Sequence, residues 1–334
     1  MNQRLSVLQN CSQITMKQLP LSRRTMTGSN GGPMTSSDMV LHRGNSYVQH
    51  GHSNNRVYVM KLSPPDTHDI IRYADELVHK EGYTKIFVKV PESLVETFEN
   101  AGYITEATVP DFFQGKEPAM FMAKYSDPDR KEVKESVKIA DALAVAFEHT
   151  GERSSYNLPD GFSLMHAHAG NAEEIAALYR SVFKTYPFPI TDPDFIRKSM
   201  QGNTRFFIIK KFHLLAAVAS CEIDAENRNA EVTDFATGLL FHGRGFASTL
   251  LHAMEKELVK EGILLAYTIA RASFGPINAI FAGAGYQFGG LLPNNTNICG
   301  STESMNVWYK KLNEGSPGPE ARSKTAEPGD CLNG

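Results

Sequence analysis

The sequence predicts a mixed α/β protein in which a larger C-terminal α/β region follows a smaller one. Strand-length apolar runs alternate with helix-length segments whose apolar residues recur every three or four positions. A glycine-rich turn at 241–248 joins one such strand to one such helix. The composition agrees with this class, since 41% of the 334 residues are hydrophobic and 21% are charged.

Charge and cysteine content argue against several classes of function. The formal net charge is -3 and no Lys/Arg-rich block occurs, so we expect no nucleic-acid partner. We expect no secretory signal and no membrane partner, because no apolar run reaches the length of a bilayer span. The four cysteines lack metal-ligand spacing, which favours a reduced, cytoplasmic setting without a metal. A homodimer is one assembly that the sequence allows.

The chain divides into folded regions between polar ends. Residues 1–45 and 313–334 are rich in small and polar residues, which predicts disordered tails. A small α/β region covers 46–126, and a charged linker with a bridging helix covers 127–160. The main domain covers 161–312. The small region could cover a sheet edge, form a dimer surface or make one wall of a pocket.

Periodicity, proline and glycine mark each element in turn. Pro91 suits the start of a helix, and Gly82 and Gly262 suit helix ends. The small region is predicted to contain strands at 56–62, 85–90 and 120–125 and helices at 66–81 and 91–101. The linker helix is predicted at 137–149. The main domain is predicted to contain strands at 162–166, 206–210, 214–223, 230–237, 263–270 and 304–312 and helices at 172–184, 193–200, 246–261 and 276–283.

The ends of the two regions resemble each other. A strand, a helix, the triplet 101–103 and a closing strand end the first region, and a strand, a helix, the triplet 284–286 and a closing strand end the second. Both triplets read Ala-Gly-Tyr. This similarity is either a degenerate repeat, whose first copy lacks the glycine turn, or chance.

The glycine-rich turn can bind an anion. The first-turn N–H groups of a helix lack partners within the helix, and the helix dipole favours negative charge there. Glycine lets the backbone approach such a ligand closely. The residues predicted to bind a phosphate are His242, Gly243, Arg244, Gly245, Phe246, Ala247 and Ser248.

The order of elements over 162–312 resembles the GNAT superfamily of acetyltransferases, whose turn reads Gln/Arg-x-x-Gly-x-Gly/Ala. Here the turn reads His242-x-x-Gly245-x-Ala247, and His replaces the first residue. The chain also has Phe274 and Phe281 where the family often has Asn and Tyr. The resemblance implies a GNAT-like mixed central sheet flanked by helices, with acetyl-CoA as the donor and direct attack in a ternary complex. It further implies acetyl-CoA contacts at Phe235, Ala236, Thr237, Ser273 and Asn278.

Segments 56–62, 230–237, 294–300 and 303–309 resemble the beta-lysine acetyltransferases within that superfamily. This implies that the acceptor is the terminal amine of beta-lysine. It also implies that the product, N-epsilon-acetyl-beta-lysine, is a compatible solute accumulated under salt stress. Two alternatives are an acetyl-CoA-binding protein without turnover and an acetyltransferase acting on another amine or a peptide.

Acyl transfer to an amine needs a base, since an ammonium has no lone pair. Glu231 is the first candidate, because its position resembles that of the base in some family members, and Asp234 is the competitor. Strand alternation puts the two on opposite faces unless a bulge intervenes. The family has such a bulge, which would free the N–H of Phe235 or Ala236 for the oxyanion.

The remaining candidates follow from the substrate's chemistry. Tyr286, Ser273 or water could protonate the thiolate, or no acid is needed, since a thiol has a pKa of about 8.5. An acidic pocket for an ammonium could use Asp192, Asp194, Glu222 and Glu303. Donors for a carboxylate could be Asn294, Asn295, Asn297 and Arg271, although the Asn cluster also suits a turn.

Overall fold

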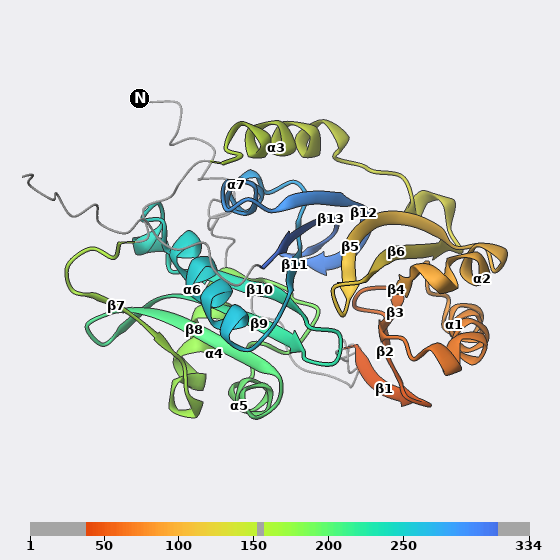
Figure 1. Ribbon diagram of the computed structural model, residues 1–334, viewed down its shortest axis with the longest axis horizontal. Coiled ribbons are helices and arrows are strands. Elements are labelled where there is room, and N and C mark those ends of the chain that lie inside the picture. Colours follow the sequence, from red (N-terminus) through yellow and green to blue (C-terminus); the bar gives the residue numbers. More distant parts are fainter. Residues whose placement is uncertain (1–37, 152–156, 313–334) are drawn as a thin grey trace, which may run out of the picture. The chain divides into compact units, whose positions relative to one another are not determined.

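The computed structural model describes residues 38–151 and 157–312 (Figure 1). Their strands form one mixed sheet in the order β1-β2-β3-β4-β6-β5-β12-β13-β11-β10-β9-β8-β7. We call β1 to β6 the N-terminal half and β7 to β13 the C-terminal half. The two halves meet where β5 pairs with β12, at Ala107 and Gly290. Gly290 is required there, because a Cβ would lie 2.4 Å from the carbonyl oxygen of Glu106.

Elements of the N-terminal half and the linker agree with much of the prediction. The strands are β1 (Met39–Arg43), β2 (Ser46–Gly51), β3 (Arg56–Lys61), β4 (Lys85–Pro91), β5 (Ile104–Phe113) and β6 (Glu117–Tyr125). The helices are α1 (Thr67–Glu81), α2 (Val95–Asn100) and the linker helix α3 (Ser136–Glu148). Figure 1 shows α3 beside α7, and Gly275 of α7 approaches Ala142 of α3 closely enough that a Cβ would lie 3.8 Å from it.

Elements of the C-terminal half follow the same pattern. The strands are β7 (Phe162–His166), β8 (Thr204–Lys211), β9 (Leu214–Asp224), β10 (Asn229–Thr237), β11 (Leu265–Arg271), β12 (Gln287–Ile298) and β13 (Ser301–Lys311). The helices are α4 (Ala172–Val182), α5 (Pro193–Gln201), α6 (Phe246–Lys260) and α7 (Gly275–Gly283). No helix among these described elements is long and apolar enough to cross a membrane.

The two halves share one pattern of strand pairing. In the N-terminal half β3 runs parallel to β4, and β6 lies antiparallel between β4 and β5. In the C-terminal half β10 runs parallel to β11, and β13 lies antiparallel between β11 and β12. Helices α1 and α2 occupy the connections that α6 and α7 occupy in the second set. The two halves therefore have the same order of strands and connecting helices, and the repeat stays a prediction.

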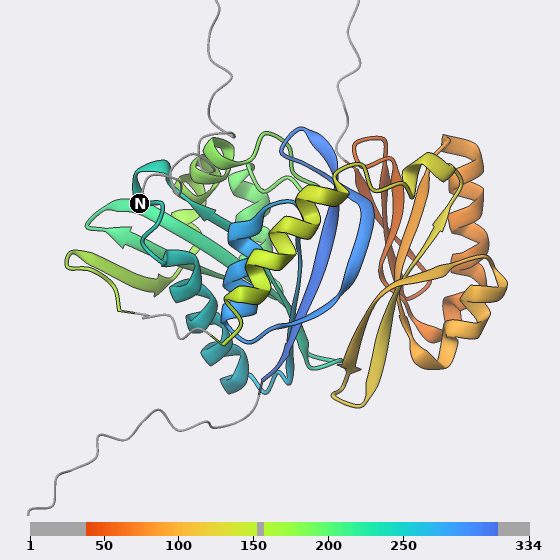
Figure 2. The same cartoon turned by 90° about the horizontal axis from the view of Figure 1, so that it is seen from above.

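Alternation along the strands gives each half two different faces. Helix α1 covers a face formed by β3, β4 and β6, and α6 and α7 cover the corresponding face of β10, β11 and β13 (Figure 2). The opposite faces share one apolar cluster, which joins Tyr58, Phe87 and Phe121 to Tyr267 and Val307. The inner faces of both halves therefore meet, and a pocket lies between them.

Several predictions about elements were wrong. Strand β1 begins at Met39, inside the predicted N-terminal tail, because it pairs with β2 in a hairpin that composition does not reveal. Strands β5 and β12 were not predicted, since each has two shifts of register and lacks regular alternation. The predicted helix at 91–101 is a short 3-10 turn followed by α2. Most of the predicted N-terminal tail (1–37) and the C-terminal tail lie outside the described residues.

Candidate active site

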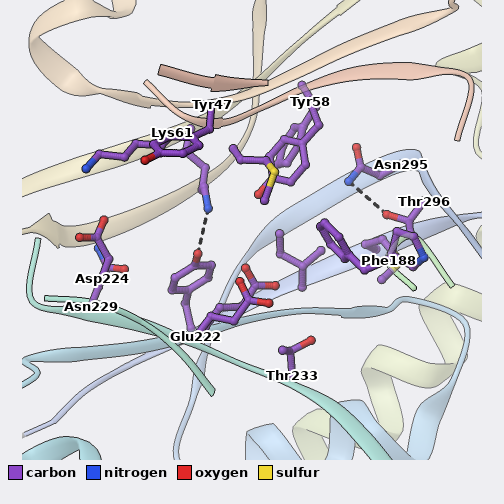
Figure 3. Close-up of a pocket in the computed structure, with 18 of the residues that line it drawn as sticks. Tyr47, Tyr58, Lys61, Phe188, Glu222, Asp224, Asn229, Thr233, Asn295 and Thr296 are labelled. Carbon is purple, nitrogen blue, oxygen red and sulfur yellow. Dashed lines mark hydrogen bonds between the residues drawn. The ribbon is translucent and has the colours of Figure 1, made fainter. Parts of the chain in front are cut away.

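A pocket with a volume of about 580 Å³ lies between the two halves. Its walls come from β3, β4 and β5 on one side and from β9, β10, β11 and β12 on the other. The loop between α4 and α5 closes part of it with Tyr186, Pro187 and Phe188. Figure 3 shows Asn295 and Thr296 beside Phe188, with Glu222 and Thr233 separate from them across the pocket. The small region thus forms one wall of the pocket.

Glu231 faces this pocket from β10. It is the last residue of β10 that pairs with β11, opposite Tyr267, and beyond it the two strands have no common register. Burial raises the pKa of Glu231, while the Lys89 ammonium and a hydrogen bond from Tyr267 work against that rise. Lys89 Nζ in turn donates to Tyr267 Oη at 2.9 Å. A buried carboxyl group that has a cation and a hydroxyl donor beside it is suited to accept a proton.

A bulge brings Asp234 to the same pocket. The register of β10 on β9 shifts between Thr233 and Ala236, and Asp234 has a φ of 56°. The bulge that the family resemblance implied is therefore present, and both Glu231 and Asp234 line the pocket. Asp234 accepts hydrogen bonds from Tyr186 and from Ser220, the latter at 2.6 Å. Because both of its oxygens have donors, Asp234 is better placed to fix the Tyr186 loop than to move a proton.

Glu222 on β9 lies directly opposite Glu231 on β10. Burial and the neighbouring carboxylates Glu231 and Asp234 raise the pKa of Glu222 to about 8. Its side chain also reaches solvent in the pocket, which works against this rise. Two carboxyl groups so placed titrate as a pair, and we assign the retained proton near neutral pH to Glu222. The pocket therefore presents the protonated carboxyl group of Glu222 beside the candidate base Glu231.

The N-terminal half contributes two cations to the pocket. Lys89 of β4 lies between aromatic rings, 5.3 Å from the Tyr267 centroid and 5.7 Å from the Tyr58 centroid. Arg56 of β3 stacks on Tyr58 at 4.9 Å, and its Nη1 donates to the backbone oxygen of Asn295 at 2.6 Å. Sequence reasoning missed both cations and both tyrosines. Lys89 carried a signal, since a lysine inside a strand that is otherwise apolar is unusual.

The turn before α6 has the geometry that a phosphate site needs. Gly243 and Gly245 have φ values of 74° and 75°, and nothing lies within 4 Å of the position of a Cβ at either. Gly245 is the N-cap of α6 without a side-chain cap, so side chains leave the first-turn N–H groups available to a ligand. His242 Nε2 donates to the backbone oxygen of Thr237 at 2.8 Å, which ties the turn to the end of β10. This backbone fits the phosphates of a coenzyme.

Comparison with known proteins gives close relatives along most of the chain. The chain is 36% identical over 273 residues to a beta-lysine N(6)-acetyltransferase of Methanococcus maripaludis, covering 82% of this chain and 98% of the relative. It is 32% identical to the enzyme of the same name from Methanosarcina mazei, covering 71% of this chain and 94% of the relative. The chain belongs to this acetyltransferase family. The family expected from the sequence is therefore confirmed.

Two further comparisons concern other acetyltransferases. An N-acetyltransferase of Bacillus subtilis, YodP, is 32% identical over 73% of this chain and 86% of its own length. A putative acetyltransferase of Salmonella typhimurium, solved with acetyl-CoA, is 14% identical, covers 48% of this chain and 99% of its own, and has a TM-score of 0.42. No protein-family model matches the chain.

Within this family fold, several predicted site residues serve the structure and do not line the pocket. Tyr286 lies in the core and packs against Phe281 with the ring centroids 5.2 Å apart. Asn278 is fully buried, and its amide nitrogen and oxygen bond the backbone and two side chains. Asp192 caps α5 by accepting from the N–H of Asp194. Glu303 holds Arg271 through two hydrogen bonds of 2.7 and 2.8 Å.

The asparagine cluster divides in the same way. Asn294 donates to the backbone oxygens of Arg130 and Glu132, and Asn297 donates to that of Ser53, so both fix loops. The cluster belongs to β12 and is not a turn, which corrects that reading. Of the eight candidate substrate residues, only Asn295 and Glu222 line the pocket. No group of three metal-binding side chains occurs in the described part of the chain.

Proposed function

We propose that the protein transfers an acetyl group from acetyl-CoA to the terminal amine of beta-lysine. The observation that carries the proposal is Glu231, which faces the pocket and lies on the strand that leads into the glycine turn. The names of the family members support the acceptor. The open turn at Gly243 and Gly245 supports the donor, since it fits a pyrophosphate.

The residues of the chain divide the chemistry between them. The carboxyl groups of Glu231 and Asp234 make the environment negative, which attracts the ammonium of the acceptor. Glu231 accepts the proton, directly or through one water, and leaves a neutral amine. As the N–C bond forms and the thioester C–S bond breaks, the N–H of Phe235 or Ala236 at the bulge stabilises the oxyanion.

The leaving thiolate needs little help. With a thiol pKa of about 8.5, it can depart as an anion and take a proton from solvent. Ser273 at the β11–α7 connection stays a candidate acid, and Tyr286 would have to act from the core. The product would be N-epsilon-acetyl-beta-lysine; its role as a compatible solute, a cytoplasmic location and a homodimer stay predictions.

A thiol-release assay with acetyl-CoA tests the proposal. Beta-lysine, lysine, diamines and a peptide mixture serve as acceptors, and the product is identified by mass spectrometry. We expect release with beta-lysine and acetylation at its terminal nitrogen. Release with peptides alone, or acetyl-CoA binding without release for any acceptor, would refute the proposed activity.

A further inference from the structure

Arg56 is a buried cation that hydrogen-bonds to no carboxylate in the described part of the chain. It begins β3, is 3% exposed and lines the pocket between the halves. Its Nη1 donates to the backbone oxygen of Asn295 at 2.6 Å and to Thr296 Oγ1 at 3.2 Å. Among the described residues, its Nε has no hydrogen-bond partner, and Asp38 and Glu231 act on Arg56 as nearby charges without a hydrogen bond to it.

An unpaired charge in such a place is costly to the fold. Burial disfavours the charged form and lowers the pKa of Arg56 to about 10, which still leaves it protonated at neutral pH. A guanidinium presents several N–H groups in one plane, which matches the two oxygens of a carboxylate. A ligand carboxylate in the pocket would offset this cost.

Asn295 presents the complementary atom beside it. The residue is 1% exposed, lines the same pocket, and its Oδ1 has no partner among the described residues. The register of β12 on β13 shifts between Leu292 and Thr296, which frees this segment from regular pairing. Figure 3 shows Asn295 on the side of the pocket away from Glu222. The amide oxygen of Asn295 can accept a hydrogen bond from a ligand ammonium, while the neighbouring arginine donates to a carboxylate of the same ligand.

We propose that Arg56 and Asn295 bind the zwitterionic head of the acceptor. Arg56 binds its carboxylate, and Asn295 Oδ1 accepts from its inner ammonium. This leaves the terminal amine at the other end of the acceptor for Glu231. The proposal rests on the proposed function and assigns its substrate class: amino acids that carry a further amine on a flexible chain. The N-terminal half thereby selects the acceptor.

Modified acceptors test each contact separately. We compare beta-lysine with its carboxamide, which lacks the anion, and with 6-aminohexanoate, which lacks the inner amine. The wild-type protein should prefer beta-lysine over the carboxamide by about 10- to 100-fold in kcat/KM, as for one charge-assisted hydrogen-bond pair. Arg56→Met should lower kcat/KM for beta-lysine to the level of the carboxamide and leave the carboxamide within about threefold.

Asn295→Leu tests the second contact, between Asn295 Oδ1 and the inner ammonium. It should lower kcat/KM for beta-lysine about 5- to 10-fold and leave 6-aminohexanoate nearly unchanged, because that acceptor lacks the inner ammonium. Arg56→Lys keeps the charge and should retain part of the preference. Lys61→Met is the matched control, since Lys61 is a cation of the same pocket that already pairs with Glu226 at 2.6 Å. It should leave all three acceptors unaffected.

The outcomes separate the two proposals. Equal use of beta-lysine and its carboxamide by the wild type, or an equal loss of both in Arg56→Met, would overturn the role of Arg56. An equal loss of beta-lysine and 6-aminohexanoate in Asn295→Leu would overturn the role of Asn295. If the wild type acetylates none of these acceptors, the proposed function fails. In that case the affinities of the wild type and Arg56→Met for beta-lysine and its carboxamide, measured by calorimetry, still test whether Arg56 binds the carboxylate.

Discussion

Replacing Lys89 by methionine should move the pH dependence of acetyl transfer. Lys89 Nζ donates to Tyr267 Oη at 2.9 Å, and the Tyr267 hydroxyl bonds Glu231. The Lys89 cation favours the ionised form of Glu231 and so lowers the pKa of that carboxyl group. Without it the pKa of Glu231 rises, and the base is protonated over a wider range of acid pH.

The size of the shift follows from the geometry. Two hydrogen bonds in series put the charges within about 6 Å, which gives about 3 kcal/mol at an effective dielectric constant of about 20. This corresponds to about two pKa units, and solvent in the pocket reduces it to about one to two. Below both pKa values turnover should fall about 10- to 100-fold, and above both it should approach the wild-type rate.

Turnover at saturating acceptor and acetyl-CoA, measured from pH 5 to 9, tests this reasoning. The acceptor amine ionises equally in both experiments, so the difference between the two profiles reports the protein. Lys89→Arg keeps the cation and should restore the wild-type profile, and Glu231→Gln should remove this acid limb. A uniform loss at every pH, or a limb that does not move, would refute the link from Lys89 to Glu231.

Two further predictions follow from the carboxylates and the turn. The pKa of Glu222 is raised to about 8 from its ordinary 4.5, so the wild type loses stability as pH rises between these values. Glu222→Gln should therefore raise the melting temperature at pH 9 but not at pH 4. An equal change of the melting temperature at both pH values would contradict this. Gly245→Val should weaken acetyl-CoA binding about 5- to 30-fold, since φ is 75° there and an L residue strains that backbone. Gly82→Val is the control, since Gly82 at the end of α1 has a similar φ of 72°; it should lower stability without changing the affinity for acetyl-CoA measured by calorimetry. Equal affinities for acetyl-CoA in Gly245→Val and Gly82→Val would exclude a role for the glycine turn.

Local patterns predicted the elements that carry their own signal. Helix α6 has a regular apolar stripe and a terminal glycine, and its predicted bounds differ by one residue from those observed. Strand β12 gave no such signal, because Gly289 and Gly290 and two register shifts replace alternation with close backbone contacts. Its asparagines looked like a turn for the same reason. Long-range pairing with β5 and β13 overrides the local preference.

The candidate site was predicted on one wall only. Glu231, Asp234 and Glu222 come from β9 and β10, where strand, bulge and turn lie close in sequence. Arg56 and Lys89 come from strands more than a hundred residues earlier, so no spacing rule connects them to Glu231. The isolated charges were visible, but their common pocket depends on the β5–β12 seam. A single sequence does not reveal that seam, because it joins residues far apart in the chain.

The shared pairing of the two halves explains why the walls differ in charge. By register, the Tyr58–Phe87 pair of β3 and β4 occupies the place of the Glu231–Tyr267 pair of β10 and β11. Pro64 and Pro65 precede α1 in place of a glycine turn. Proline has no amide hydrogen, so this connection offers fewer donors to a phosphate.

The N-terminal half therefore has neither a carboxylate at the place of Glu231 nor a glycine turn for a phosphate. Its inner face carries Arg56 and Lys89, and the seam brings this face against β10 and β11. One half thus supplies the proposed base and the glycine turn, and the other supplies the cations. The proposed binding of a carboxylate at one wall and an ammonium at the other requires charges of both signs, and the two joined halves provide them.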